Sequence, residues 1–149
     1  MPAYFAYGAN LDRIGMAQRC PGSHVVAPAR LADYRFFIMV DGYASLRPEQ
    51  GAVVHGLLWQ LAPDDLAALD AYEEIGAGLY RRLTLSVMHD AGVADAIVYV
   101  GRSRETGESR PGYMENVLAA ATLGGLPEAY LRELRGWLPA TSRPSAAMA

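Results

Sequence analysis

The sequence predicts one α+β domain, a small mixed but mostly antiparallel β-barrel flanked by helices. Five or six segments rich in β-branched and aromatic residues occupy the first two thirds of the chain. Two segments with helical spacing follow them. No repeat and no linker-like stretch divides the chain, so we expect a single domain over residues 1–139. The small-residue, proline-containing tail at 140–149 is expected to be disordered. Periodicity alone leaves open whether the barrel closes.

The N-terminal elements are predicted from turn and cap residues. The aromatic segment 4–7 favours a short strand that ends at Gly8. Asn10 and Asp12 supply N-cap chemistry for a helix that runs to about Cys20, where a Pro-Gly pair ends it. Residues 25–40 then have the composition of a strand.

The remaining elements follow from the same signals. Pro63 and the two acids after it are typical of the first turn of a helix, which the glycines at 76 and 78 end. The short link between 88 and 94 favours a hairpin. We expect strands at 44–46, 52–61, 80–88 and 94–100, a polar loop at 101–111, and helices at 113–122 and 127–137.

Composition excludes several classes of protein. The net charge of −3 argues against nucleic acid as a partner. No apolar run approaches the roughly 18 residues that a membrane span needs. The N-terminus has no basic region followed by an apolar stretch, and the one cysteine forms no internal disulfide. We therefore expect a cytoplasmic protein, monomeric or homodimeric.

Motifs for cofactors and metals are also missing. All thirteen basic residues are arginine, which excludes a lysine Schiff base and a P-loop lysine. His24, His55 and His89 are too far apart for a ligand spacing, so we expect no metal. Cys20 has no partner motif and is interpreted as an inert thiol. We expect no cofactor.

Two segments have the composition of a catalytic site. The first is the turn formed by Tyr7, Gly8, Ala9, Asn10 and Leu11. Backbone N–H groups at a helix start bind anions or a developing oxyanion, and glycine lets a ligand approach closely. An ordinary strand-to-helix turn explains the same residues.

The second segment has adjacent acids, Glu73 and Glu74, in the last turn of the helix that Pro63 opens. Carboxylates there face the negative end of the helix dipole, which costs roughly 0.3–1 kcal/mol each. The same field raises the pKa of a carboxyl group, which suits a residue that takes and gives protons. Two solvated acids at a frayed helix end are the alternative interpretation.

The order of these segments resembles the γ-glutamylcyclotransferase family, which includes AIG2-like proteins. The resemblance covers roughly residues 3–137, and its most specific part joins the segment YFAYGANL at 4–11 with Glu73 and the Gly78/Tyr80 pair. Further matching residues are Gly42-Tyr43-Ala44, Gly56-Leu57-Leu58-Trp59, Leu69-Asp70, Tyr99, Tyr113 and Gly125-Leu126-Pro127.

The resemblance implies an enzyme that cyclises a small γ-glutamyl compound to 5-oxoproline and releases an amine. It implies that Glu73 is the catalytic acid and base and that the family barrel holds the site. The expected substrate-binding residues are Tyr7, Gly8, Ala9, Asn10, Leu11, Tyr80, Tyr99 and Tyr113.

The sequence departs from the family pattern at two positions. Ala9 stands where serine is common, and Glu74 stands where glycine is frequent. Arg102, Arg104 and Arg110 in the polar loop are either ligands for a substrate carboxylate or solvated surface charges. A binding module without catalysis is the alternative function, because a fold does not fix its function.

Overall fold

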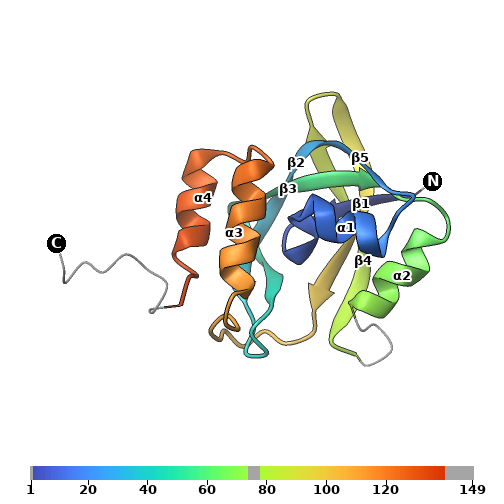
Figure 1. The fold of residues 1–149 in the computed structure, drawn as a ribbon. Helices are drawn as coiled ribbons and strands as arrows, with labels where there is room; N and C mark the ends of the chain where they lie inside the picture. Colours follow the sequence, from blue (N-terminus) through green and yellow to red (C-terminus); the bar gives the residue numbers. More distant parts are fainter. Residues whose placement is uncertain (1, 74–77, 140–149) are drawn as a thin grey trace.

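The computed structural model describes residues 2–73 and 78–139. The expected disordered tail at 140–149 and the departure at residue 74 lie outside the described residues. Five strands close into a barrel in the order β1-β3-β2-β4-β5, which confirms the predicted fold class. Figure 1 shows the barrel with helices on its sides. The strands are β1 (Ala3–Ala6), β2 (His24–Ile38), β3 (Ala44–Gln60), β4 (Tyr80–His89) and β5 (Gly92–Gly101).

The barrel closes through its shortest strand. β1 pairs antiparallel with β3, with Phe5 opposite Leu58. Its other edge meets β5 in parallel at Tyr4 and Ile97. The remaining pairs are antiparallel, so the barrel is mixed but mostly antiparallel. A side chain at position 56 of β3 would collide with the Ala6 carbonyl, and glycine there lets β1 cross closely.

The long β2–β3 hairpin corrects one prediction. The expected strands at 44–46 and 52–61 are parts of the single strand β3, which pairs with β2 along almost its whole length. Pro48 is accommodated opposite Tyr34, where the register shifts. Asp33 and Gly51 adopt positive φ angles of 66° and 84°, and the Asp33 carboxylate accepts the Gly51 N–H at 3.0 Å. These residues bend the hairpin without interrupting it.

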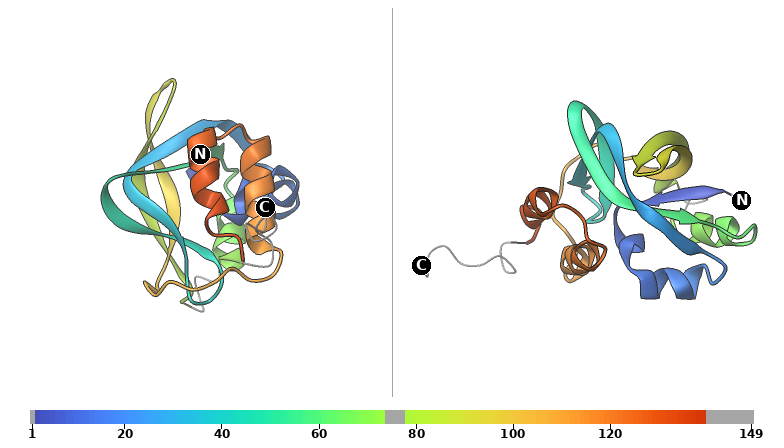
Figure 2. Two further views of the ribbon diagram at one scale, coloured as in Figure 1. Left: turned by 90° about the vertical axis from the view of Figure 1, so that its left-hand side faces the viewer. Right: turned by 90° about the horizontal axis from the view of Figure 1, so that it is seen from above.

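The helices lie around the barrel in two groups. Figures 1 and 2 show α3 (Tyr113–Leu123) and α4 (Glu128–Arg135) side by side on one flank, apart from α1 (Arg13–Arg19) and α2 (Asp65–Tyr72). The 3-10 helix η1 (Ala9–Leu11) links β1 to α1. Asp12 caps α1 by accepting the Ile14 N–H at 3.1 Å, as its sequence position predicts.

The start of α2 differs by two residues from the prediction. The helix begins at Asp65, because the Asp65 carboxylate accepts the Ala62 N–H at 3.2 Å and so forms a turn ahead of the helix. Pro63 lies in that turn. Among the described helices, none has both the length and the apolarity to cross a membrane.

The core is one cluster inside the barrel and beneath the helices. Phe5, Phe36 and Phe37 are fully or almost fully buried in it. From α3 and α4, Val117 and Leu134 reach the same cluster. The ends of β1 and α2 border a cavity that this packing leaves open.

Candidate active site

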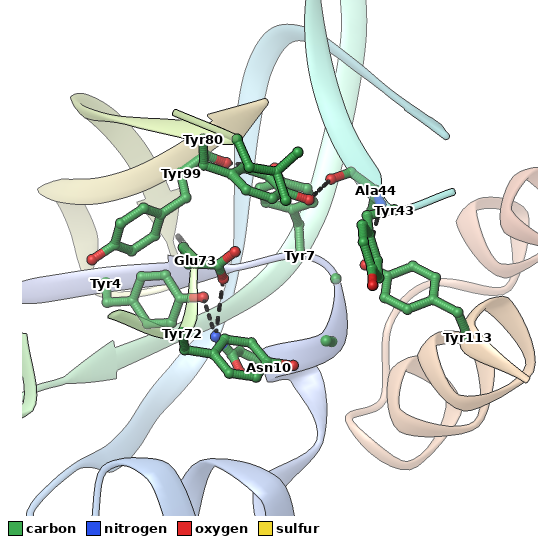
Figure 3. A pocket seen from close by; sticks show the side chains of 13 residues that line it. Tyr4, Tyr7, Asn10, Tyr43, Ala44, Tyr72, Glu73, Tyr80, Tyr99 and Tyr113 are labelled. Carbon is green, nitrogen blue, oxygen red and sulfur yellow. Dashed lines mark hydrogen bonds between the residues drawn. The ribbon is translucent and has the colours of Figure 1, made fainter. Parts of the chain in front are cut away.

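A cavity of about 190 Å³ lies between the turn after β1 and the C-terminal end of α2. Tyrosines dominate its wall, since seven of the nine tyrosines in the chain line it. Figure 3 shows these rings surrounding one carboxylate. The lining residues are Tyr4, Tyr7, Gly8, Ala9, Asn10, Tyr43, Ala44, Tyr72, Glu73, Leu79, Tyr80, Tyr99 and Tyr113.

Glu73 supplies that carboxylate. It is the C-cap residue of α2, and its N–H donates to the Leu69 carbonyl at 2.8 Å. Its side chain is half-buried and turns toward the ring of Tyr4 and the cavity. The Asn10 amide nitrogen lies 3.4 Å from Glu73 Oε1. The end of a helix and the start of a 3-10 helix therefore meet at this carboxylate.

Asn10 has a fixed orientation because its partners differ at its two ends. Its Oδ1 accepts from the Arg19 guanidinium at 2.5 Å. Its Nδ2 therefore faces the other way, donating to the Tyr4 hydroxyl at 2.9 Å and toward Glu73. Arg19 is itself held over the Tyr72 ring, 4.1 Å from its centroid. Arg19 thus selects the amide orientation that presents a donor to the carboxylate.

The tyrosine hydroxyls around the cavity stay protonated. Burial raises the pKa of each, and the negative charge of Glu73 raises it further. The hydroxyls are therefore neutral donors at physiological pH. Because the Tyr4 hydroxyl accepts from Asn10, its own proton remains available for another acceptor. The tyrosines whose pKa is raised in this way are Tyr4, Tyr7, Tyr80, Tyr99 and Tyr113.

The turn after β1 presents backbone N–H groups to the cavity. The first hydrogen bonds of η1 run from Leu11 N–H to the Gly8 carbonyl and from Asp12 N–H to the Ala9 carbonyl. The N–H groups of Ala9 and Asn10 precede these bonds and have no acceptor within the helix, and the Ala9 N–H interacts with the Tyr113 hydroxyl instead. A Cβ at position 8 would lie 3.2 Å from the Tyr113 hydroxyl, so glycine keeps this side open.

Tyr113 closes the cavity on the side of α3. Its hydroxyl accepts the Ala44 N–H at 3.1 Å, and burial raises its pKa while the Ala44 and Ala9 backbones lower it in part. The Tyr80 hydroxyl donates to the Ala44 carbonyl at 2.6 Å. The backbone of Ala44 thereby fixes two of the tyrosines.

Asp70 anchors α2 to the barrel. Its Oδ1 accepts the Tyr99 hydroxyl of β5 at 2.6 Å, and its Oδ2 pairs with Arg82 of β4 at 2.7 Å. The Tyr99 carbonyl in turn accepts the Tyr7 hydroxyl. Because Asp70 precedes Glu73 by one helical turn, these contacts set the position of the carboxylate in the cavity.

The cavity wall contains Glu73 and all but one of the expected substrate-binding residues. Leu11 differs, because η1 turns its side chain inward, where it is 1% exposed and belongs to the core. Arg110 stacks on Tyr43 at 4.7 Å and donates to the Asp41 carbonyl, outside the cavity. Arg102 and Arg104 line another cleft.

Sequence reasoning did not assign Tyr4, Tyr43, Ala44 and Leu79 to the cavity wall, and it gave no role to Arg19 behind it. The high tyrosine content was the available signal. Within the described residues no group of three or more histidine, cysteine, aspartate and glutamate side chains forms a metal cluster.

Sequence comparison places the chain among known proteins. The sequence model of the AIG2-like family matches residues 53–134, more than half of the chain. The chain belongs to the AIG2-like family. It is 25% identical to a mouse γ-glutamylcyclotransferase and 26% identical to the human one. Each alignment covers 91% of this chain and 78% of the relative.

Structural comparison agrees with this assignment. A solved γ-glutamyl cyclotransferase superposes with a TM-score of 0.86 at 25% identity, covering 99% of this chain and 95% of that chain. The five-stranded barrel and its helices therefore match the γ-glutamylcyclotransferase fold.

Proposed function

We propose that the protein is a γ-glutamylcyclotransferase that converts a small γ-glutamyl amide or peptide into 5-oxoproline and a free amine. The observation that carries this proposal is the Glu73 carboxylate, which faces the cavity between α2 and the Gly8 turn. Relatives with this activity in their names align with most of the chain and share its fold. A cavity of about 190 Å³ suits a small substrate, since pockets for drug-sized ligands measure about 300–1,000 Å³.

Glu73 acts as general base and then as general acid. The substrate's α-ammonium gives a proton to the carboxylate, and the amine that results attacks the γ-carbonyl carbon of the same molecule. The C–N bond of the ring forms, and the electron pair of the carbonyl moves to its oxygen. When the tetrahedral intermediate collapses, the bond to the leaving nitrogen breaks and that nitrogen takes the proton from Glu73. The ring nitrogen then gives its second proton to the Glu73 carboxylate, which passes it to the released amine and is again ready to act as a base. No water is consumed.

The Gly8 turn stabilises the charge that develops on the γ-carbonyl oxygen. The Asn10 N–H has no acceptor within η1, and Asn10 lines the cavity wall. Donors fixed before the reaction cost no reorganisation when the oxyanion forms. The neutral hydroxyl of Tyr4 adds a donor beside Glu73.

The tyrosine walls fold the glutamyl chain on itself. An intramolecular attack requires the amine and the carbonyl carbon to lie about 3–3.5 Å apart, and a narrow cavity favours that conformation. Tyr7, Tyr80, Tyr99 and Tyr113 are the side chains that we assign to this task. The chemistry needs no cofactor, and we expect it to take place in the cytoplasm.

The test is a panel of substrates with purified protein. γ-Glutamyl dipeptides, γ-glutamylamines and glutathione are incubated separately in water enriched in ¹⁸O, and the products are identified by mass spectrometry. We expect 5-oxoproline without ¹⁸O and one equivalent of amine from at least one class. Labelled glutamate would show hydrolysis instead and would reject the intramolecular attack.

The matched control is a second Glu→Gln change on the surface. Glu128 on α4 is exposed and pairs with Arg135, far from the cavity in sequence and on another flank of the barrel. Glu128→Gln is expected to retain activity while Glu73→Gln loses it. If no member of the panel yields 5-oxoproline but one binds at Glu73, the non-catalytic binding module replaces this proposal.

A further inference from the structure

A second cleft lies beside the catalytic cavity, where the ends of two hairpins meet. Its volume is about 140 Å³. Four of its ten lining residues are arginines, and none of the ten is acidic. The four, which we call the arginine cleft, are Arg47, Arg81, Arg102 and Arg104.

The topology of the barrel opens this cleft. β2 and β4 are neighbours through a single residue pair, Arg30 and Met88, so their other ends separate. The Gly101 N–H at the end of β5 donates to Ser45 Oγ of β3 at 2.9 Å. The four arginines therefore converge from three places in the chain: the first half of β3, the start of β4 and the loop after β5.

Among the described residues, no ion pair supplies the cleft with a counterion. Three ion pairs occur among the described residues, and none includes an arginine of the cleft. Glu49, close by on β3, is bound to Arg35 at 2.6 Å. Four of the thirteen arginines thus gather at one place on a chain whose net charge is −3. Arg81, Arg102 and Arg104 are exposed, so solvent screens part of their mutual repulsion, and an anion bound among them would offset the rest.

One arginine of the cleft is held in position. The Arg47 guanidinium donates to Thr106 Oγ1 at 3.3 Å and lies 5.1 Å from the centroid of the buried Phe37 ring. The loop that carries Thr106 is itself joined to the barrel by a bridge between Met39 and Thr106. Preorganisation of this kind lowers the entropic cost of binding a ligand.

We propose that the arginine cleft binds a phosphate-bearing small molecule. A phosphate monoester carries nearly two negative charges and three acceptor oxygens, which match several guanidinium groups better than one carboxylate does. A volume of about 140 Å³ holds roughly five water molecules, about the number of heavy atoms in a phosphate group. Leu46 and Val100 are buried beneath the arginines and offer an apolar floor for the organic part.

This site is separate from the proposed cyclotransferase chemistry. Neither Glu73 nor any tyrosine of the catalytic cavity lines the cleft. The two share only a wall, since Ala44 and Leu79 line the cavity while Leu46 and Arg102 line the cleft. The proposal therefore stands or falls independently of the enzyme activity.

The experiment is isothermal titration calorimetry of the full chain at low ionic strength, which measures the affinity and stoichiometry of three ligands: inorganic phosphate, AMP and adenosine. We expect phosphate and AMP to bind once per chain and to compete, while adenosine does not bind. If AMP binds more tightly than inorganic phosphate, the natural ligand of the site is a phosphate ester. If inorganic phosphate binds more tightly than AMP, the natural ligand is the free ion. Arg104→Gln is expected to weaken binding about tenfold, and Arg81→Gln/Arg104→Gln further.

A matched control removes the same charge elsewhere. Arg132 is exposed on α4, and Arg132→Gln is expected to bind phosphate like wild type. Equal weakening by Arg132→Gln and Arg104→Gln would reveal a general charge effect and overturn the proposal. Absence of saturable binding of both phosphate and AMP to folded wild type would overturn it as well. Circular dichroism melts establish that each variant is folded, and Arg104 lies in a loop where no strand pairing is lost.

Discussion

Replacing Asn10 with alanine removes the amide that connects Arg19 to the carboxylate of Glu73. Asn10 is 2% exposed, so water does not replace its partners. A hydrogen bond to a neutral group contributes about 1 kcal/mol, and one to a charged group about 1.5–3 kcal/mol. Asn10 donates to the Tyr4 hydroxyl at 2.9 Å and accepts from Arg19 at 2.5 Å. Since Arg19 is only half-buried, we expect Asn10→Ala to lower the free energy of unfolding by about 2–4 kcal/mol.

The assay combines thermal unfolding with kinetics of 5-oxoproline release. A loss of about 2–4 kcal/mol corresponds to a decrease in Tm of roughly 5–15 °C for a domain of this size. We also expect kcat, measured at a temperature below the new Tm, to fall about 10–100-fold relative to wild type. The reason is that Glu73 loses the donor that orients it. Asn116→Ala on the exposed face of α3 is the matched control and should change neither quantity.

Asn10→Asp separates stability from catalysis. The aspartate keeps an acceptor for Arg19 and recovers part of the stability, but it loses the donor and places a second negative charge beside Glu73. The acid limb of the pH–rate profile should therefore move to higher pH, with low activity at neutral pH. Wild-type kcat in Asn10→Asp, or unchanged Tm in Asn10→Ala, would refute the role assigned to this amide.

Three further predictions follow from the same contacts. Asp70→Ala frees α2 from Tyr99 and should cost about 1–2 kcal/mol of stability, measured by urea unfolding; an unchanged midpoint would contradict the anchoring role. Gly8→Ala places a methyl group 3.2 Å from the Tyr113 hydroxyl and should raise KM about tenfold with little change in Tm, whereas unchanged KM would show that the turn is not near the substrate. Burial raises the pKa of Cys20 to about 11, so about one thiol in a thousand is ionised at pH 8, and Ellman's reagent should react only after denaturation. Rapid labelling of native protein would contradict this burial.

The sequence predicts most of the fold because local signals agree with the final structure. Alternation and the short link at residues 88–94 predict the β4–β5 hairpin, and Asp12 predicts the start of α1. The continuity of β3 is not predictable, because Pro48 and Gly51 are typical of a break, and only the paired strand β2 carries the chain through them. The parallel contact that closes the barrel is also invisible to periodicity.

The candidate site is predictable only in part. The Gly8 turn and Glu73 were linked by family resemblance, although 63 positions separate Asn10 from Glu73 in the sequence. The contributions of Arg19 and Asp70 depend on side chains that meet across different elements, which no spacing rule reports. Leu11 is the converse case, a residue that the sequence assigned to the site but that does not line it. Its neighbours in the chain line the cavity, whereas the tight turn of η1 buries its side chain.

The most direct test of the proposed chemistry is the rate of 5-oxoproline formation by Glu73→Gln relative to wild type, on the best substrate of the panel. Glutamine retains an oxygen that accepts from Asn10 but cannot exchange a proton, so the fold and Tm should persist. The account predicts a decrease in kcat of about 10²–10⁴-fold, the usual contribution of general acid–base catalysis. A folded Glu73→Gln variant with kcat close to that of wild type would contradict it.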